Sequence, residues 1–151
     1  FNRIDGISIS TNEINVANGL NINNYKSYFF NKFEYNVFSN SIFSKYDVII
    51  DVNLKSFSCC EPSFKKLFTD YNYLLNQNGT IITGKRGMNW SRMVKPVIRF
   101  SFKKFFYKRL KEFDGPNSNL LPIAECINLA KEHNLKLNEV DNTSIVTFAK
   151  I

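Results

Sequence analysis

Polar side chains that are able to take part in catalysis follow a short run of β-branched residues near the middle of the chain. The run Val48 to Ile50 lies between polar residues, a pattern typical of a parallel strand that is buried on both faces. Asp51, Val52 and Asn53 come directly after it. Ligands of open α/β sheets bind beyond the carboxyl ends of the strands, so these three residues are expected to line a crevice. Asp51 and Asn53 are the catalytic candidates; alternatively, the Asp51 carboxylate caps local backbone groups.

A second polar pair follows the next predicted strand. Lys85 and Arg86 come just after the apolar run Thr80 to Thr83. Their positive charge and their place at a strand end suit an anionic acceptor, so both are candidate substrate-binding residues. Two solvated surface charges are an equally good interpretation of the same pair.

Several kinds of chemistry find little support in the sequence. His133 is the only histidine, and its place at a predicted helix end favours a surface position stabilised by the helix dipole. A Ser-His-Asp triad is therefore not available within these 151 residues. The three cysteines form neither a disulfide framework nor a zinc ligand set, so no metal site is predicted and a reducing, cytoplasmic setting is expected.

The composition predicts a folded, basic domain. Apolar residues make up 44% of the chain and aromatic residues 15%, enough for one sizeable core. A net charge of +7 favours an anionic partner or substrate, although a basic surface without a partner has the same charge. No apolar run approaches the roughly 20 residues that a membrane-spanning helix needs, so no transmembrane segment is expected. The oligomeric state is not predicted.

Hydrophobic spacing predicts strands that alternate with helices along a single domain, residues 1–151. The expected strands are Ile4 to Ile9, Tyr35 to Phe38, Tyr46 to Ile50, Thr80 to Thr83, Leu135 to Val140 and Ser144 to Ile151. Four helices are expected: one that begins at the Ser10–Glu13 capping box, Tyr25 to Lys32, Glu61 to Asn76 and Leu121 to His133. Gly79 is expected to stop the third helix. The fourth helix is expected to turn Ile123, Ile127 and Ala130 toward the core. The last two strands are close enough in sequence to pair as an antiparallel hairpin.

The most basic segment lies within residues 91–117, between the predicted strands at Thr80 and Leu135. From Arg92 to Phe113, an apolar stripe alternates with crowded Lys and Arg residues. Three interpretations remain open: a lid or substrate-recognition insertion over the acceptor, a basic helix that faces nucleic acid or membrane, and a core-packed helix with a solvated polar face.

This order of elements is typical of an α/β fold with a mostly parallel sheet, helices on both faces and an antiparallel C-terminal hairpin. It resembles the Rossmann-like class I S-adenosylmethionine-dependent methyltransferases from their second strand onward. Gly6-Ile7-Ser8-Ile9-Ser10 is similar to the family's second strand and its exit. Tyr46-Asp47-Val48-Ile49-Ile50 is similar to the opening of its fourth strand. Leu74 to Ile82 resembles the approach to its fifth strand, and the segment from Ile123 to Leu137 resembles its penultimate helix and sixth strand.

The resemblance implies a cofactor, S-adenosylmethionine, and residues that hold it. By that pattern Ser8 and Glu13 share the contact to the ribose hydroxyls, and Asn40 takes the place of the residue that meets the adenine amino group. Asp51 and Val52 form part of the cofactor wall. The strands beginning at Ile4, Val48 and Thr80 are then expected to run side by side in the same direction.

The family's glycine-rich first strand and loop have no counterpart in the sequence, which leaves two alternatives. Either they lie upstream of Phe1, or the chain is a non-catalytic relative that acts as a basic binding or scaffold subunit. For the enzyme, the resemblance implies methyl transfer, which depends mainly on alignment of the acceptor; proximity contributes roughly 7–11 kcal/mol in favourable systems. A small-molecule or glycan acceptor, anionic or neutral, is favoured over nucleic acid, because no nucleic-acid-binding motif is present.

Overall fold

Six strands form two sheets in the part of the chain that the structure describes. The structure is a computed structural model and describes residues 2–34, 37–39, 43–55, 58, 60–86, 120–140 and 143–151. Its elements are β1 (Ile4–Ser8), α1 (Thr11–Gly19), β2 (Tyr25–Phe29), the 3-10 turn η1 (Val37–Ser39), β3 (Tyr46–Asp51), α2 (Glu61–Leu74), β4 (Leu75–Gly84), α3 (Ile123–Glu132), β5 (Leu135–Glu139) and β6 (Ile145–Lys150). One sheet contains β1 and β2, and the other has the order β3-β4-β6-β5.

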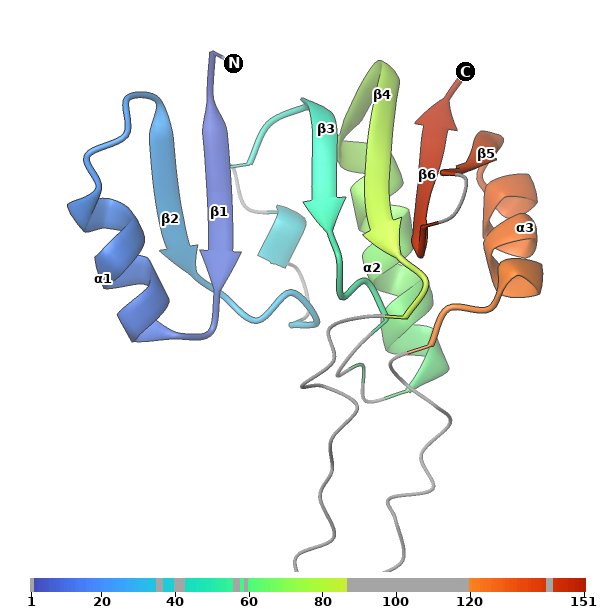
Figure 1. Cartoon of the computed structure of the whole chain (residues 1–151), viewed down its shortest axis with the longest axis horizontal. Helices are drawn as coiled ribbons and strands as arrows, with labels where there is room; N and C mark the ends of the chain where they lie inside the picture. Colours follow the sequence, from blue (N-terminus) through green and yellow to red (C-terminus); the bar gives the residue numbers. More distant parts are fainter. Residues whose placement is uncertain are drawn as a thin grey trace, which may run out of the picture.

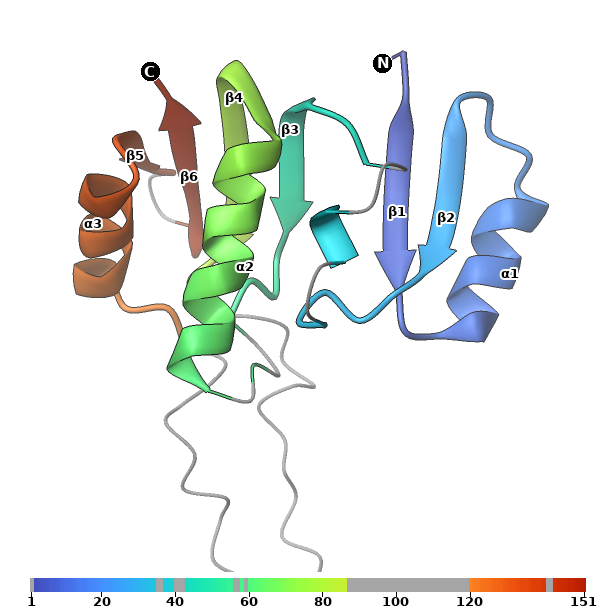
Figure 2. The same ribbon diagram turned by 180° about the vertical axis from the view of Figure 1, so that it is seen from behind.

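The two sheets lie edge to edge, with β1 facing β3 (Figures 1 and 2). The pairs β1–β2 and β3–β4 are parallel, whereas β6 is antiparallel to both β4 and β5. The expectation that β1, β3 and β4 run in the same direction is confirmed, and their carboxyl ends lie on one side of the molecule (Figure 1). The C-terminal hairpin is confirmed as well. The fold is thus α/β. Its described strands form two sheets, because β1 is hydrogen-bonded to β2 and β3 to β4, with no strand pairing between β1 and β3.

The core lies between the larger sheet and α2, which lies behind the sheet in Figure 1 and in front of it in Figure 2. Pro62 suits the first turn of α2, where a backbone N–H would have no helical partner. One face of the helix is apolar and fully buried, and it includes Phe64, Leu67, Phe68, Tyr71 and Leu74. The Phe68 ring packs edge-on against Phe148 of β6, with 5.0 Å between the ring centroids. This helix therefore anchors the strands whose ends form the candidate site.

The predicted end of α2 was wrong by two residues. The helix stops at Leu74 and β4 begins at once at Leu75, although regular pairing with β3 starts only at Thr80, opposite Val48. Asn78 has a φ of 65°, so it supplies the left-handed turn that we expected from Gly79.

The segment Tyr25 to Lys32 was predicted as a helix, and this prediction is wrong. Tyr25–Phe29 forms strand β2, which pairs with β1 residue by residue from Ile4 opposite Tyr25 to Ser8 opposite Phe29. Aromatic side chains suit a pleated surface, and pairing with β1 overrides the local helical spacing. Similarly, Val37 and Phe38 belong to the turn η1 rather than to a strand, and both are buried.

The face that α3 buries also differs from the prediction. Ile123 and Ile127, expected inside, are 41% and 40% exposed, whereas Cys126, Leu129 and Ala130 are buried. The helix is therefore rotated so that Cys126 faces the core, where burial raises the pKa of its thiol to about 11. His133 ends the helix with its ring packed on Phe68 at 5.0 Å, and this burial lowers the pKa of the imidazole.

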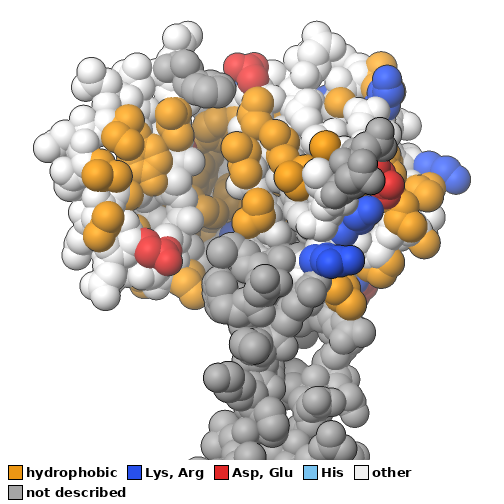
Figure 3. All heavy atoms as spheres, viewed as in Figure 1, with side chains coloured by type: hydrophobic (Ala, Val, Ile, Leu, Met, Phe, Trp, Pro, Cys, Tyr) orange, Lys and Arg blue, Asp and Glu red, His pale blue; other side chains and the backbone are white. Residues whose placement is uncertain are grey.

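One face of β3 is not covered, which contradicts the expectation of a strand buried on both sides. Ile49 packs against the core, but Val48 is 38% exposed and Ile50 is 69% exposed. Figure 3 shows apolar side chains gathered on this face of the molecule. Residues 91–117 lie outside the described residues, so the three interpretations of this segment stay predictions. Among the described residues, no helix is both long and apolar enough to span a bilayer.

Candidate functional site

The carboxyl end of β3 carries a network of hydrogen bonds centred on Asp51. Lys32, from the loop after β2, donates from Nζ to Asp51 Oδ2 at 2.7 Å and to the Asn53 carbonyl at 2.6 Å. The Tyr71 hydroxyl of α2 donates to the same Oδ2 at 3.0 Å. The backbone N–H of Asn53 donates to Asp51 Oδ1 at 3.0 Å. Asp51 thus joins both sheets and α2, and the predicted capping of local backbone by its carboxylate is present at Asn53.

The network is largely removed from water. The side chains of Lys32 and Asp51 are 18% and 12% exposed. Burial lowers the pKa of the Lys32 ammonium, and the Asp51 carboxylate opposes this shift. Burial raises the pKa of the Tyr71 phenol, and Asp51 adds to the effect. Tyr71 therefore keeps the proton that it donates, and Lys32 pairs with the Asp51 carboxylate at 2.7 Å, so this carboxylate is suited to positioning the strand end.

Ser8 and Glu13, which the resemblance assigned to the ribose, lie together at the carboxyl end of β1. The Ser8 hydroxyl donates to Glu13 Oε2 at 2.5 Å and accepts from the Ser10 N–H at 3.0 Å. Ser10 caps α1 as predicted, because its side chain accepts from the Glu13 N–H at 3.3 Å. Glu13, however, turns to Ser8 rather than to the Ser10 N–H. The pair is exposed and presents carboxylate oxygens beyond the strand end.

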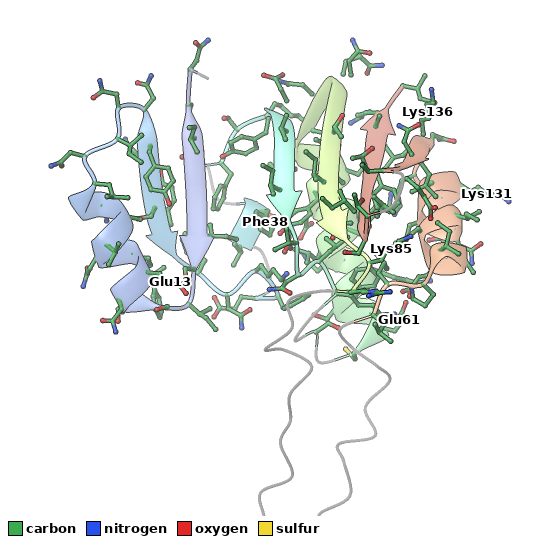
Figure 4. The ribbon with its side chains drawn as sticks, viewed as in Figure 1. Glu13, Phe38, Glu61, Lys85, Lys131 and Lys136 are labelled. Atoms are coloured by element: carbon green, nitrogen blue, oxygen red, sulfur yellow. The ribbon has the colours of Figure 1, made fainter. Side chains whose placement is uncertain are left out.

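The remaining predicted site residues have different surroundings. Val52 is 46% exposed after β3. Lys85 follows β4, lies 3.2 Å from Glu139 Oε1, and forms backbone hydrogen bonds with Ser144 and Leu121. Figure 4 shows Glu13 and Lys85 on the same side of the molecule, beyond the carboxyl ends of β1 and β4. Arg86 adjoins Lys85. Asn40 lies outside the described residues, so its assignment to adenine stays a prediction.

A cavity of about 320 Å³ separates β1 from β3. Asp5, Gly6 and Ile7 line one side, and the residues of β3 from Val48 to Asp51 line the other. At the amino ends of the strands, the Tyr46 hydroxyl donates to Asp5 Oδ2, and burial raises the pKa of this phenol to about 12. At the carboxyl ends, Lys32 and Asp51 close the cavity. Two polar bridges therefore join the sheets across this cavity.

Sequence reasoning missed Lys32, Tyr71 and Tyr46. Lys32 lies in a segment that was predicted to be helical, and a lysine beside Asn31 at the end of such a segment is expected to be solvated. Tyr71 was recognised only as part of the apolar face of a helix, since helical spacing does not reveal where a hydroxyl group points. The available signal was Asp51 itself: a carboxylate after a buried strand requires donors, and tyrosine on the covering helix is one source.

Only the comparison with solved structures finds similar proteins. No protein-family model matches the sequence, and no curated protein matches it either. Among solved structures, the N-methyltransferase NodS from Bradyrhizobium japonicum WM9 is similar, with a TM-score of 0.61 and 9% identity over 98% of this chain and 73% of that chain. NodS in complex with S-adenosyl-L-homocysteine gives the same TM-score, with 10% identity over 98% of this chain and 66% of that chain.

Two further solved structures extend the similarity. A TehB-like SAM-dependent methyltransferase from Corynebacterium glutamicum has a TM-score of 0.57 and 12% identity over 99% of this chain and 68% of that chain. The CurJ carbon methyltransferase has a TM-score of 0.59 and 16% identity over 97% of this chain and 41% of that chain. Identities this low show a shared fold and no more. The chain has the fold of the class I S-adenosylmethionine-dependent methyltransferases, as its sequence pattern predicted.

Proposed function

We propose that this chain is the larger part of an S-adenosylmethionine-dependent methyltransferase that acts on a small-molecule or glycan acceptor. The observation that carries the proposal is the arrangement of β1 and β3, which line opposite sides of one cavity. The Ser8–Glu13 pair and the Asp51 network lie at the carboxyl ends of these two strands, on the same side of the molecule. Strand ends that face each other in this way are where α/β folds bind nucleosides.

The residues at these strand ends fit the groups of the proposed cofactor. The Glu13 carboxylate accepts one hydrogen bond from Ser8 and has further lone pairs for the two hydroxyl groups of a ribose. Asp51 and Val52 would form the opposite wall, with Lys32 and Tyr71 holding Asp51 in place. When bound, S-adenosylmethionine supplies an electrophilic methyl group.

The role of the chain in the reaction is then mainly alignment. Asp51 is held by Lys32, Tyr71 and the Asn53 N–H, so we assign it to positioning the end of β3 against the cofactor. The Asn53 side chain is the group that we propose to meet the acceptor. Alignment alone contributes roughly 7–11 kcal/mol in favourable systems, so a general base is optional. Lys85 and Arg86, beyond β4, are proposed to attract an anionic group of the acceptor.

Calorimetric titration of the full-length natural protein with S-adenosylhomocysteine tests this proposal. We expect a dissociation constant in the micromolar range, and adenosine monophosphate, which lacks the amino-acid portion, should bind at least about tenfold more weakly. Absence of binding at about 1 mM S-adenosylhomocysteine would reject the cofactor and leave the alternative, a non-catalytic binding subunit with this fold.

A further inference from the structure

The two groups that we propose to meet the acceptor, Asn53 and Lys85, lie beyond the ends of neighbouring strands. Regular pairing of β3 with β4 ends at Asp51 opposite Thr83, so the strands themselves do not fix how the residues after them are placed. Residues 52–55 form a turn. Contacts outside the sheet must therefore set the distance between the two groups.

Lys55, at the end of this turn, is held by a carboxylate of α3. Its Nζ lies 2.6 Å from both side-chain oxygens of Glu125 and 3.6 Å from Glu61 Oε2. The same ammonium lies over the Phe64 ring, 5.3 Å from the centroid. The side chains of Lys55 and Glu125 are 13% and 21% exposed. Charges so far from water need close contact to offset the cost of burial, so the pair favours one arrangement of the turn and the helix.

The backbone of the turn is fixed at both of its ends. The Lys55 carbonyl accepts from the Ser58 N–H at 3.4 Å and from the Ser58 hydroxyl at 3.0 Å. At the other end, Asn53 donates its N–H to Asp51 and accepts at its carbonyl from Lys32. Asn53 therefore lies between two anchors, and Lys55 is the one that reaches α3.

The start of α3 is in turn joined to the end of β4. The Leu121 N–H donates to the Lys85 carbonyl at 2.7 Å, and the Lys85 N–H donates to the Ser144 carbonyl at 2.7 Å. Leu121 is buried, and α3 begins at Ile123 with Glu125 in its first turn. A series of contacts and short backbone links therefore runs from the turn at Asn53 through Lys55, Glu125 and Leu121 to Lys85.

We propose that Lys55 is a positioning residue: through Glu125 it fixes Asn53 at one strand end relative to Lys85 at the next. The proposal rests on the proposed function, in which these two groups meet the acceptor. Methyl transfer depends on alignment of the acceptor, so the separation of the groups that hold it decides which acceptors reach a productive position. Lys55 acts through the carboxylates that hold its ammonium, and it does not itself contact the acceptor.

The proposed cofactor wall is held by other contacts. Lys32 and Tyr71 bind the Asp51 carboxylate from the loop after β2 and from α2. Loss of the Lys55 charge should therefore release the turn at Asn53 while the cofactor still binds. Calorimetry should give a dissociation constant for S-adenosylhomocysteine in Lys55→Met within about threefold of that of the natural protein. A loss of affinity greater than about tenfold would overturn the assignment of Lys55 to the acceptor side.

Hydrogen exchange of the Asn53 amide in the full-length natural protein tests the proposal without cofactor. Lys55→Met removes the charge but keeps a long side chain, and it should speed exchange of this amide at least about tenfold. Lys65→Met is the matched control, because the Lys65–Glu132 pair also contacts α3, at 4.0 Å, but its side chains are 54% and 51% exposed. The control should change the exchange rate by less than about twofold. Equal exchange of Asn53 in the two variants would overturn the proposal.

A variant of the core separates positioning from a general loss of stability. Phe148→Leu destabilises the core at the contact between Phe148 and Phe68. Exchange by local opening does not depend on global stability, so the Asn53 amide should keep its rate within about twofold even where the melting temperature falls as far as in Lys55→Met. Equally fast exchange in Phe148→Leu and Lys55→Met would mean that Lys55 acts only on overall stability, and the proposal would fail.

A double-mutant cycle with Glu125→Gln tests the link to α3. If Lys55 acts through Glu125, the double variant should exchange at Asn53 within about twofold of Lys55→Met, whereas multiplied effects of the two single changes would contradict the link. Lys55→Arg keeps the charge and should return the rate to within about threefold of the natural one. The two proposals fail separately: absence of S-adenosylhomocysteine binding to the natural protein rejects the function, and unchanged exchange in Lys55→Met rejects the positioning role.

Discussion

Lys32 Nζ lies 2.7 Å from Asp51 Oδ2, so the loop after β2 is tied to the end of β3 in the other sheet. A buried ion pair of this kind stabilises a particular arrangement more than it stabilises the fold, but removal of one partner leaves a buried charge. The pair therefore fixes how the two halves of the proposed site face each other.

Replacement of Lys32 by Met should lower the free energy of unfolding by about 2–4 kcal/mol, because the buried Asp51 side chain then loses its partner in the ion pair. Urea unfolding measures the change. Lys26→Met is the matched control, since Lys26 is exposed on β2, and it should change the stability by less than about 0.5 kcal/mol. If both variants unfold at the same urea concentration, the Lys32–Asp51 pair does not hold the sheets.

Replacement of Tyr71 by Phe should lower the stability by about 1–2 kcal/mol. The ring keeps its edge-on contact with Phe38, at 5.4 Å between centroids, but the hydroxyl that donates to Asp51 is lost. Tyr73→Phe serves as the control, because Tyr73 is 68% exposed on the same helix. A Tyr71→Phe protein as stable as Tyr73→Phe would show that the hydroxyl contributes nothing to the Asp51 network.

Replacement of Glu13 by Gln should weaken S-adenosylhomocysteine binding about tenfold, which corresponds to about 1.4 kcal/mol, because an amide has only one oxygen to accept from the ribose hydroxyls. Ser8→Ala should act in the same direction, since Ser8 orients Glu13. Asn12→Ala, in the same turn of α1, is the control. If the ribose binds elsewhere, calorimetry would show the same affinity for S-adenosylhomocysteine in the Glu13→Gln, Ser8→Ala and Asn12→Ala variants.

The stability of the protein should fall on acidification through the histidine range. Burial against Phe68 lowers the pKa of His133 below its usual 6.5 in the folded state, so the unfolded state binds the proton more readily. The contribution of His133 is therefore fully present above pH 6.5 and is lost as the pH falls from there toward the lower folded-state pKa. Melting curves between pH 7.5 and 5 should show this loss, and His133→Gln should reduce it. An equal pH dependence in both proteins would mean that His133 titrates normally.

The strands β1, β3, β4, β5 and β6 were readable from the sequence because clear turn signals bound them, as at Ser10 and Asn78. The failure at Tyr25 to Lys32 has a physical reason: the strand β2 is stabilised by its pairing with β1, a contact that local spacing does not contain. For the same reason Lys32 was missed, since its partner Asp51 is 19 residues away in sequence.

The exposure of Ile50 shows a different limit. The run Val48 to Ile50 correctly indicated a strand, but the prediction that both of its faces are buried was wrong, because Ile50 is 69% exposed. Sequence pattern reports the environment for which a residue is suited, and the structure reports which neighbours are present.

Mapping of hydrogen exchange in the full-length protein, with and without S-adenosylhomocysteine, tests most directly whether the strand ends of β1 and β3 form the cofactor site. The account predicts slower exchange on ligand addition in the segments from Ser8 to Glu13 and from Asp51 to Asn53, with β5 and β6 unchanged. Slower exchange confined to other segments, while these two stay unchanged in the presence of bound ligand, would contradict it.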